Sequence, residues 1–339
     1  MRELEEIQLR SEIISANKIA LLIRSAIGDF LLAIPAIKLI KKCNPSAKIY
    51  LFCDETVATI AGHTDLFSKI ICIVNGWNKY FSLLITTLKF RKKFDAFVAL
   101  KAGAGRQNSL AAFGLKAKYS FSYFHNYHQS YMTDRYISHK LFLSQEELQK
   151  VHYSRLCMNM VTNKKIPYLP PHEYFPKLIN IDSPSENGIY IVIPITSAED
   201  RRKPNIKFYS VLIKEIIKKL PQINIILSCL PIDKHYASQL TTVDPHRVLL
   251  KATPNFENFL SLIYGAKLVL GGDGGAMHIA AAMQIPTYIY LSEYSDLVWS
   301  PLSEVSKKTR FKFSFDELKQ DQIILETVEY ISSNQQINT

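Results

Sequence analysis

The apolar residues of this chain follow two alternating patterns. Short continuous apolar runs predict buried strands, and between them apolar residues recur at every third or fourth position, which predicts amphipathic helices. A strand, a helix and another strand in succession imply a parallel sheet with a right-handed crossover. The pattern therefore predicts an α/β protein.

The first half of the chain contains one such series. The predicted strands lie at 18–23, 49–53, 70–74, 96–100 and 119–123, and the predicted helices include 79–93, 106–113 and 145–160. A further apolar helix, which contains Pro35, follows the first strand. We expect the Tyr-rich segment 125–144 to form a long loop.

A second series begins after a proline-rich stretch. Residues 166–187 contain five prolines and few periodic apolar residues, which is typical of a linker. Predicted strands and helices then alternate over 189–195, 206–220, 223–227, 233–240, 248–250 and 256–264, followed by a strand, a turn, a helix and a strand within 268–291. We therefore predict two doubly wound, Rossmann-like domains, at 1–165 and 188–315. A Ser-x-x-Glu capping box at Ser314 and Glu317 predicts a last helix within 316–339.

Composition sets the broad class of the protein. With 339 residues, 47% of them hydrophobic, the chain can bury two domain cores. The five cysteines are scattered and lack Cys-x-x-Cys spacing, which is typical of a reduced cytoplasmic protein. The sequence has no apolar run long enough to span a bilayer, and its charged first residues do not resemble a secretory leader.

The positive charge is confined to the first half. Residues 1–165 hold 24 Lys and Arg against 12 Asp and Glu, whereas residues 166–339 hold 17 against 18. A basic half is expected to attract nucleic acid, anionic lipid or an acidic sugar. The alternative is a lysine-rich surface that serves only solubility.

The sequence GGDGG at 271–275 separates a predicted strand from a predicted helix. The first amides of such a helix, here those of Gly274 and Gly275, have no partner within it and carry the positive end of its dipole. A phosphate or diphosphate is therefore the expected ligand. Asp273 and His278 add polar groups within reach of a ligand hydroxyl. The alternative is a glycine turn that serves only close packing.

The order Asp-x-Gly-x-x-His at 273–278, followed by Ala-Ala and Pro, resembles the donor-site signature of glycosyltransferase family 9, the ADP-heptose:lipopolysaccharide heptosyltransferases. The segment 256–267 is similar to the helix that precedes this signature. One departure is visible, because the family usually has Thr or Ser where Gly274 stands. The backbone amide would then act without a hydroxyl.

The segment 24–37 is similar to the second hallmark of the family, a strand that ends in a Gly-Asp turn before an apolar helix with Pro. The resemblance implies that Asp29 is the catalytic base. Otherwise an Asp at this place is a helix cap or a first-turn carboxylate. The presence of both motifs favours the base.

A loop after the first strand of the second domain is also similar to the family. Thr196 and Ser197 match two hydroxyl residues, Arg201 matches a Lys, and Lys203 stands where Trp is usual. Hydroxyls and cations at the carboxyl end of a strand suit a diphosphate. The pattern leaves open whether Arg201, Arg202 or Lys203 touches phosphate, and the alternative is a solvated basic loop.

Further candidates come from both domains. The resemblance implies that Asp233 contacts a ribose hydroxyl, although a helix cap is equally compatible with its position. It also places acceptor-binding groups where Lys101 and Arg106 stand. The glycines between these two form only part of a dinucleotide fingerprint, which disfavours an oxidoreductase. His125 and His128 have a metal-ligand spacing but no third ligand patterned nearby, so no metal site is predicted.

The resemblance extends from about Lys18 to Pro301 and implies a GT-B fold, in which two Rossmann-like domains face a central cleft and the last helix packs back on the first domain. It implies inverting transfer of heptose from a nucleoside diphosphate, ADP-heptose, to the Kdo–lipid A or inner-core region of lipopolysaccharide. No cofactor is required, and a divalent cation is an optional stimulant. The basic half suits this acceptor and the anionic inner-membrane surface, so we expect a peripheral cytoplasmic enzyme that binds no nucleic acid. The alternatives are a nucleotide-sugar epimerase of the same fold and a non-catalytic glycan- or nucleotide-binding relative.

Overall fold

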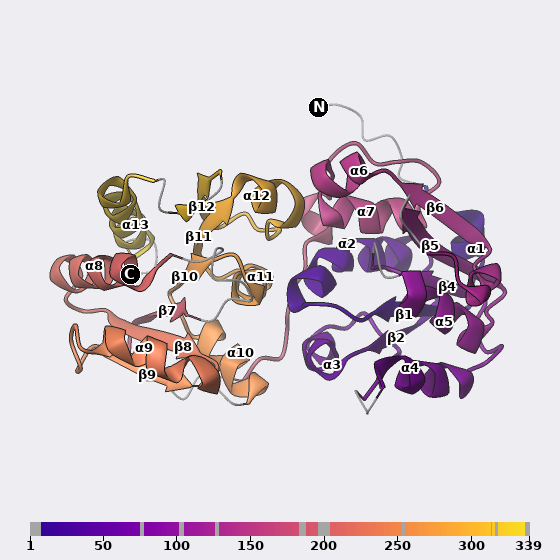
Figure 1. Cartoon of the computed structure of the whole chain (residues 1–339), viewed down its shortest axis with the longest axis horizontal. Helices are drawn as coiled ribbons and strands as arrows, with labels where there is room; N and C mark the ends of the chain where they lie inside the picture. Colours follow the sequence, from indigo (N-terminus) through magenta and orange to yellow (C-terminus); the bar gives the residue numbers. More distant parts are fainter. Residues whose placement is uncertain are drawn as a thin grey trace. The chain divides into compact units, whose positions relative to one another are not determined.

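The computed structural model describes residues 8–74, 78–101, 105–125, 129–182, 188–195, 204–252, 255–312, 314–315 and 318–335. The chain divides into two compact units, Met1–Pro176 and Lys177–Thr339. Each unit has its own six-stranded sheet, and every pair of neighbouring strands is parallel (Figure 1). The α/β class predicted from the alternating pattern is therefore confirmed.

The first sheet has the order β3-β2-β1-β4-β5-β6. Its strands are β1 (Lys18–Ile23), β2 (Lys48–Cys53), β3 (Lys69–Cys72), β4 (Ala96–Ala99), β5 (Tyr119–His125) and β6 (His139–Leu143). The central strands β1 and β4 are almost wholly buried. Both faces of a parallel sheet are covered by helices, which is why these strands are continuous apolar runs.

Two pairs of helices pack on the first sheet, among the seven helices that the structure describes in the first unit. These seven are α1 (Ser11–Ile14), α2 (Ile27–Cys43), α3 (Glu55–Gly62), α4 (Lys79–Leu88), α5 (Gly105–Leu115), α6 (Gln145–Lys150) and α7 (Tyr153–Val161), with the 3-10 turns η1 (Met132–Tyr136) and η2 (His172–Tyr174). Figure 1 shows α2 with α7 on one side of the sheet and α4 with α5 on the other.

The second sheet has the order β12-β11-β10-β7-β8-β9. Its strands are β7 (Tyr190–Pro194), β8 (Asn224–Cys229), β9 (Val248–Ala252), β10 (Leu268–Gly272), β11 (Thr287–Ser292) and β12 (Ser306–Phe311). The helices are α8 (Ile206–Lys219), α9 (Lys234–Thr241), α10 (Phe256–Tyr264), α11 (Gly275–Ala282), α12 (Glu293–Trp299) and α13 (Gln320–Gln335), with the turn η4 (Pro231–Asp233) before α9. The predicted strand, turn, helix and strand within 268–291 are confirmed.

Two edge strands differ from the sequence prediction. The segment 125–144, predicted as a loop, contains η1 and β6, and the edge strand β12 was also missed. An edge strand is covered by fewer neighbours, so it carries charged residues and loses the apolar run that marks a buried strand. The predicted helix at 145–160 is two helices, because the chain breaks at Val151 and His152 and His152 accepts a hydrogen bond from the amide of Ser154.

The early part of the predicted linker and the last helix each pack within one unit. The division between the two units falls within the predicted linker 166–187, and the early part of this segment is fixed on α2, where Lys38 Nζ donates to the carbonyl of Phe175 at 2.5 Å. The last helix begins at Gln320, later than the capping box predicts. Its buried residues Ile324 and Val328 belong to the core of the second unit, where α13 packs on α8. The buried side of this helix therefore packs within the second unit, and its packing on the first domain stays a prediction.

Candidate functional site

In both sheets the strand order reverses beside the first strand of the unit. In the first sheet β1 lies between β2 and β4, and in the second sheet β7 lies between β8 and β10. Ligands of open parallel sheets bind beyond the carboxyl ends of the strands at such a reversal, because the flanking connections diverge to opposite faces there. Candidate residues should therefore follow β1 and β4 in the first unit and β7 and β10 in the second.

Asp29 occupies the expected position after β1. It lies half-buried in the first turn of α2, whose N-cap residue is Ala26. Burial raises the pKa of the Asp29 carboxyl, and the opposing effects of Lys101, Ser25 and the Ala26 amide do not cancel this rise. Asp29 is therefore a first-turn carboxylate, but one that is a stronger base than an exposed Asp.

Lys101 follows β4 and comes close to Asp29. Its ammonium acts on the Asp29 carboxyl, and its Nζ lies 3.5 Å from the carbonyl oxygen of Arg24, the residue after β1. The structure therefore brings the predicted base, Asp29, close to Lys101, one of the two predicted acceptor-binding residues. Arg106, the other predicted acceptor-binding residue, is exposed at the start of α5. Its guanidinium lies 4.4 Å from the ring centre of Tyr80.

We expect the Lys101→Met variant to need a higher pH for activity than the wild type. The Lys101 ammonium lowers the pKa of Asp29, so its removal leaves burial less opposed and the pKa rises further. A base acts only when deprotonated, so the acid limb of the kcat/KM profile should move to higher pH. The profile of Lys118→Met, which removes an exposed lysine of the same unit, should not move. If the acid limb of the kcat/KM profile of Lys101→Met stays at the wild-type pH, Lys101 does not act on the base.

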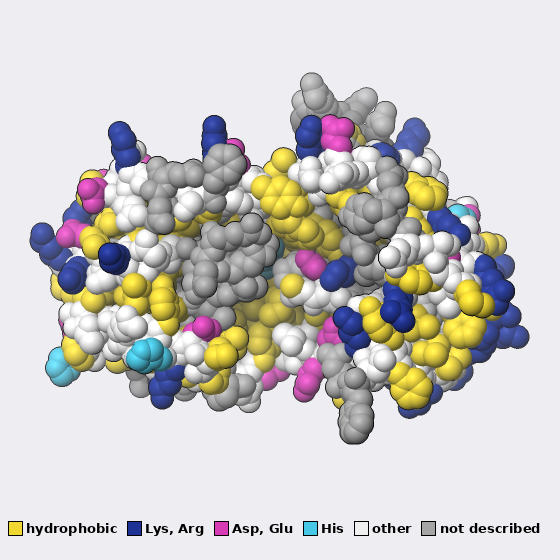
Figure 2. Space-filling view, viewed as in Figure 1, with side chains coloured by type: hydrophobic (Ala, Val, Ile, Leu, Met, Phe, Trp, Pro, Cys, Tyr) yellow, Lys and Arg dark blue, Asp and Glu magenta, His cyan; other side chains and the backbone are white. Residues whose placement is uncertain are grey.

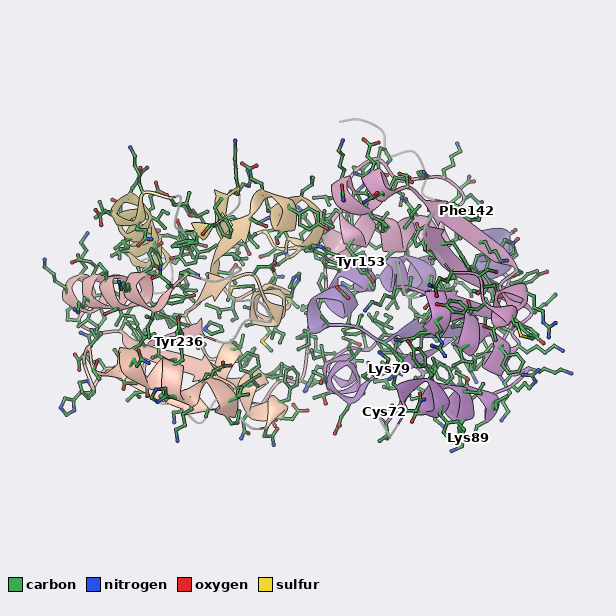
Figure 3. All side chains as sticks on the ribbon, viewed as in Figure 1. Cys72, Lys79, Lys89, Phe142, Tyr153 and Tyr236 are labelled. Carbon is green, nitrogen blue, oxygen red and sulfur yellow. The ribbon has the colours of Figure 1, made fainter. Side chains whose placement is uncertain are left out.

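Two buried residues of α7, which were not predicted, bind the carbonyl of Leu100, the residue before Lys101. The Tyr153 hydroxyl donates to the carbonyl of Leu100 at 2.9 Å, and the Cys157 thiol donates to the same oxygen at 3.4 Å. Figure 3 labels Tyr153 at the start of α7. Burial and the Asp29 carboxylate raise the pKa of the Cys157 thiol, so this thiol stays neutral. The spacing of 153 and 157 indicates a shared helix face, but the sequence does not reveal which strand end that face meets.

Arg24 is the second unpredicted feature. Its side chain is 4% exposed, and its Nε lies 2.8 Å from Asp54 Oδ1, just past β2. Its Nη1 donates to the carbonyl of Lys79, the first residue of α4, at 3.0 Å. Arg24 therefore ties together the ends of β1 and β2 and the start of α4, directly before the turn that carries Asp29.

The second unit places its glycine turn at the other reversal point. Asp273 and His278 are buried, and Gly274 is the N-cap residue of α11 with extended backbone. A Cβ on Gly271 would lie 3.5 Å from the carbonyl oxygen of Pro194, so β10 and β7 come close at this end. The amide of Met277 donates to the carbonyl of Gly274, which leaves the amides before it directed out of the helix start.

We expect Gly274→Ser to be tolerated and to lower the KM for the donor severalfold. A Cβ at this position meets no heavy atom within 4 Å, and the extended φ of −179° suits any residue. Serine is a good N-cap and would supply the hydroxyl that the family usually has here. Steady-state kinetics with varied donor would test this, with Gly62→Ser as control, because Gly62 also has no heavy atom near its Cβ position. A KM that rises would show that the turn excludes side chains.

Of the other residues predicted to bind the sugar donor, the structure describes only Asp233. Asp233 follows β8 and stands at the N-cap position of α9, but its side chain makes no cap hydrogen bond. The remaining four, Thr196, Ser197, Arg201 and Lys203, lie outside the described residues. His128 also lies outside them, and across the described part of the chain no group of three metal-ligating side chains occurs. No helix in that part combines the length and apolar content needed to cross a bilayer.

Two Rossmann-like units with polar residues at each reversal point are the arrangement of GT-B glycosyltransferases. A family model, glycosyltransferase family 9 (heptosyltransferase), matches residues 124–309. The match covers more than half of the chain, so the protein belongs to glycosyltransferase family 9 and is a glycosyltransferase.

Individual relatives agree with this assignment. Lipopolysaccharide heptosyltransferase 1 of Campylobacter coli is 23% identical over an alignment of 289 residues, and the match covers 80% of this chain and 82% of that protein. The structure of E. coli heptosyltransferase WaaC with ADP has a TM-score of 0.72 at 16% identity and covers 92% of this chain and 99% of its own. E. coli ADP-heptose lps heptosyltransferase II has a TM-score of 0.75 at 15% identity, with coverages of 94% and 99%. The structural likenesses show a GT-B fold.

Proposed function

We propose that this protein transfers heptose, with inversion, from ADP-heptose to the Kdo–lipid A or inner-core region of lipopolysaccharide. The observation that supports this most directly is the Asp29 carboxylate, whose pKa is raised by burial and which stands beside Lys101 at the strand reversal of the first unit. The family assignment favours transfer over the epimerase and binding-only alternatives.

In the proposed reaction, Asp29 takes the proton of an acceptor hydroxyl. The hydroxyl oxygen then attacks the anomeric carbon of the donor, and the bond from this carbon to the diphosphate breaks on the opposite side. A base with a raised pKa accepts the proton more readily, as long as the working pH keeps it ionised. Lys101 keeps Asp29 ionised at lower pH than burial alone would allow.

The departing diphosphate needs fixed positive partners. The amides of Gly274 and Gly275 at the start of α11 would serve this purpose, together with Thr196, Ser197, Arg201 and Lys203. These groups can meet the leaving charge without a required cofactor, and a divalent cation would be an optional stimulant. Asp273, His278 and Asp233 would hold donor hydroxyls. The ADP bound to one E. coli relative supports the choice of nucleotide.

The acceptor carries carboxylates and phosphates, which suit the excess of cations in residues 1–165. Lys101 and Arg106 would contact it directly. Such an acceptor lies in a membrane, so we infer peripheral action at the cytoplasmic face of the inner membrane and no role in nucleic-acid binding.

The test is transfer by the purified protein. We expect ADP-heptose and Kdo–lipid A, or a core already carrying heptose, to give a product heavier by one heptose residue in mass spectrometry. Conversion of the donor sugar without an acceptor would instead indicate an epimerase. Donor binding without transfer to any core acceptor would indicate a binding protein. Lipopolysaccharide from cells that lack the protein should be truncated at the step it performs.

A further inference from the structure

An apolar stripe lies on the solvent side of α4. Phe81, Ile85 and Leu88 are 63%, 40% and 40% exposed, whereas Leu83 and Thr87 are fully buried. An α-helix turns by about 100° per residue, so the three exposed residues share one side, opposite the two buried ones. A surface helix normally turns its polar side to water, and an apolar side in that position is typical of an interaction surface.

The neighbouring helix α5 fixes this orientation. Gly114 lies so close to α4 that a Cβ there would be 2.0 Å from the Thr87 hydroxyl oxygen. This hydroxyl also donates to the carbonyl of Leu83 at 2.8 Å, one turn earlier in α4. Glycine is needed for such a close approach, and the tight contact keeps α4 from rolling its apolar stripe inward.

Lysines flank the stripe at both ends of α4. Lys79 precedes it and Lys89, Lys92 and Lys93 follow it, and no Asp or Glu occurs between residues 79 and 93. Figure 3 labels Lys79 and Lys89 at the opposite ends of the helix, and Figure 2 shows hydrophobic and basic side chains together over this part of the first unit. Within the described chain, none of the four lysines forms an ion pair with a carboxylate. Phe81, Ile85, Leu88, Lys89, Lys92 and Lys93 are called the α4 face below, whereas Lys79 lies about 200° around the helix from Phe81 and is not part of it.

We propose that the α4 face docks on an anionic phospholipid bilayer. The apolar stripe would enter the boundary between headgroups and acyl chains, while the lysines contact lipid phosphates. Neither signal alone gives firm binding to a membrane, but an apolar side combined with a basic cluster does. This docking proposal rests on the proposed function in one respect, that the acceptor of the transfer reaction is a membrane lipid.

Charge and geometry favour a bilayer over other occupants. Lysine ammonium groups on flexible stems suit many equivalent headgroups, whereas a fixed acidic site on a protein is better matched by the planar fork of arginine. Arg91, the one arginine of the segment, is turned away, because its Nη1 donates to the carbonyl of Phe113 at 2.6 Å. Nucleic acid would bind the lysines through its phosphates, but the exposed apolar stripe would stay in contact with water.

The test is co-sedimentation of the full-length protein with vesicles, in the absence of donor and acceptor. We expect binding to vesicles of phosphatidylcholine and phosphatidylglycerol, little binding to phosphatidylcholine alone, and weaker binding at high salt. The triple variant Phe81→Gln/Ile85→Gln/Leu88→Gln should bind at least about tenfold more weakly. Lys89→Gln and Lys93→Gln should each weaken binding about fivefold.

Matched controls separate docking from folding and from catalysis. Phe142→Gln removes an aromatic side chain of the same unit that is 68% exposed, and Lys214→Gln/Lys218→Gln removes two exposed lysines of α8. Both controls should bind vesicles like the wild type, and all variants should keep its melting temperature and its transfer rate to a water-soluble short acceptor. The proposal is overturned if the triple variant binds like the wild type, if phosphatidylcholine alone binds equally, or if the wild type remains in the supernatant. If the wild type transfers no sugar to the soluble acceptor but still binds vesicles, the proposed function is refuted and the proposed membrane docking stands.

Discussion

Asp29→Asn should lower kcat for sugar transfer about a hundred- to ten-thousand-fold, the range typical of losing a general base. Asparagine has nearly the same shape as aspartate but cannot accept the acceptor proton. Because the first turn of α2 and the donor site in the second unit stay intact, the Kd for donor should hardly change. Single-turnover kinetics and donor titration would separate the two effects.

The same substitution should stabilise the protein at neutral pH. Burial raises the pKa of Asp29 above its unfolded value, so the folded state holds this proton more tightly. Its contribution to stability is therefore present below the unfolded pKa and is lost as pH rises through the folded pKa. At neutral pH the half-buried Asp29 carboxylate opposes folding, and asparagine removes this opposition. We expect a higher Tm at neutral pH and no gain in acid.

An exposed carboxylate of the same unit provides the control for both measurements. Asp65→Asn should leave kcat and Tm unchanged, because Asp65 is exposed in the loop before β3. If Asp29→Asn keeps its turnover, another group removes the proton. If it loses both turnover and stability, Asp29 serves mainly to hold the first turn of α2.

Arg24→Met should lower the free energy of unfolding by about 3 kcal/mol, the lower end of the range for removing one partner of a buried ion pair. Methionine fills much of the space but leaves the Asp54 carboxylate and the Lys79 carbonyl without their donor. Asp54 is 27% exposed, and partial access to water places the effect at this lower end. Urea unfolding curves would give the change.

The ion pair between Lys42 and Glu173 offers a matched control. Its N–O distance is 2.9 Å, close to that of the Arg24 pair, but its side chains are 62% and 59% exposed. Lys42→Met should leave the unfolding curve unchanged, because water screens an exposed pair. Arg24→Met should also reduce kcat, since Arg24 fixes the strand end directly before Asp29. Equal effects of the two substitutions would show that burial of the Arg24 pair has no energetic importance.

The sequence by itself determined the α/β class, the order of most strands and helices, and the position of the glycine turn before α11. These features depend on local rules: buried parallel strands need continuous apolar runs, and glycine marks the turn between β10 and α11. The edge strand β6 was not predicted. It pairs with only one neighbouring strand and is less covered, so it carries exposed residues such as Lys140 and has no continuous apolar run. The same reason applies to β12.

The tertiary structure alone decided which distant residues meet. Lys101 reaches Asp29, and Cys157 approaches it from α7, because the sheet order places β4 beside β1 and α7 packs on α2. The buried pair of Arg24 and Asp54 and the outward apolar side of α4 likewise depend on packing between elements far apart in the chain. Local sequence patterns record whether a residue is buried, but partner and direction follow only from how helices and strands are stacked.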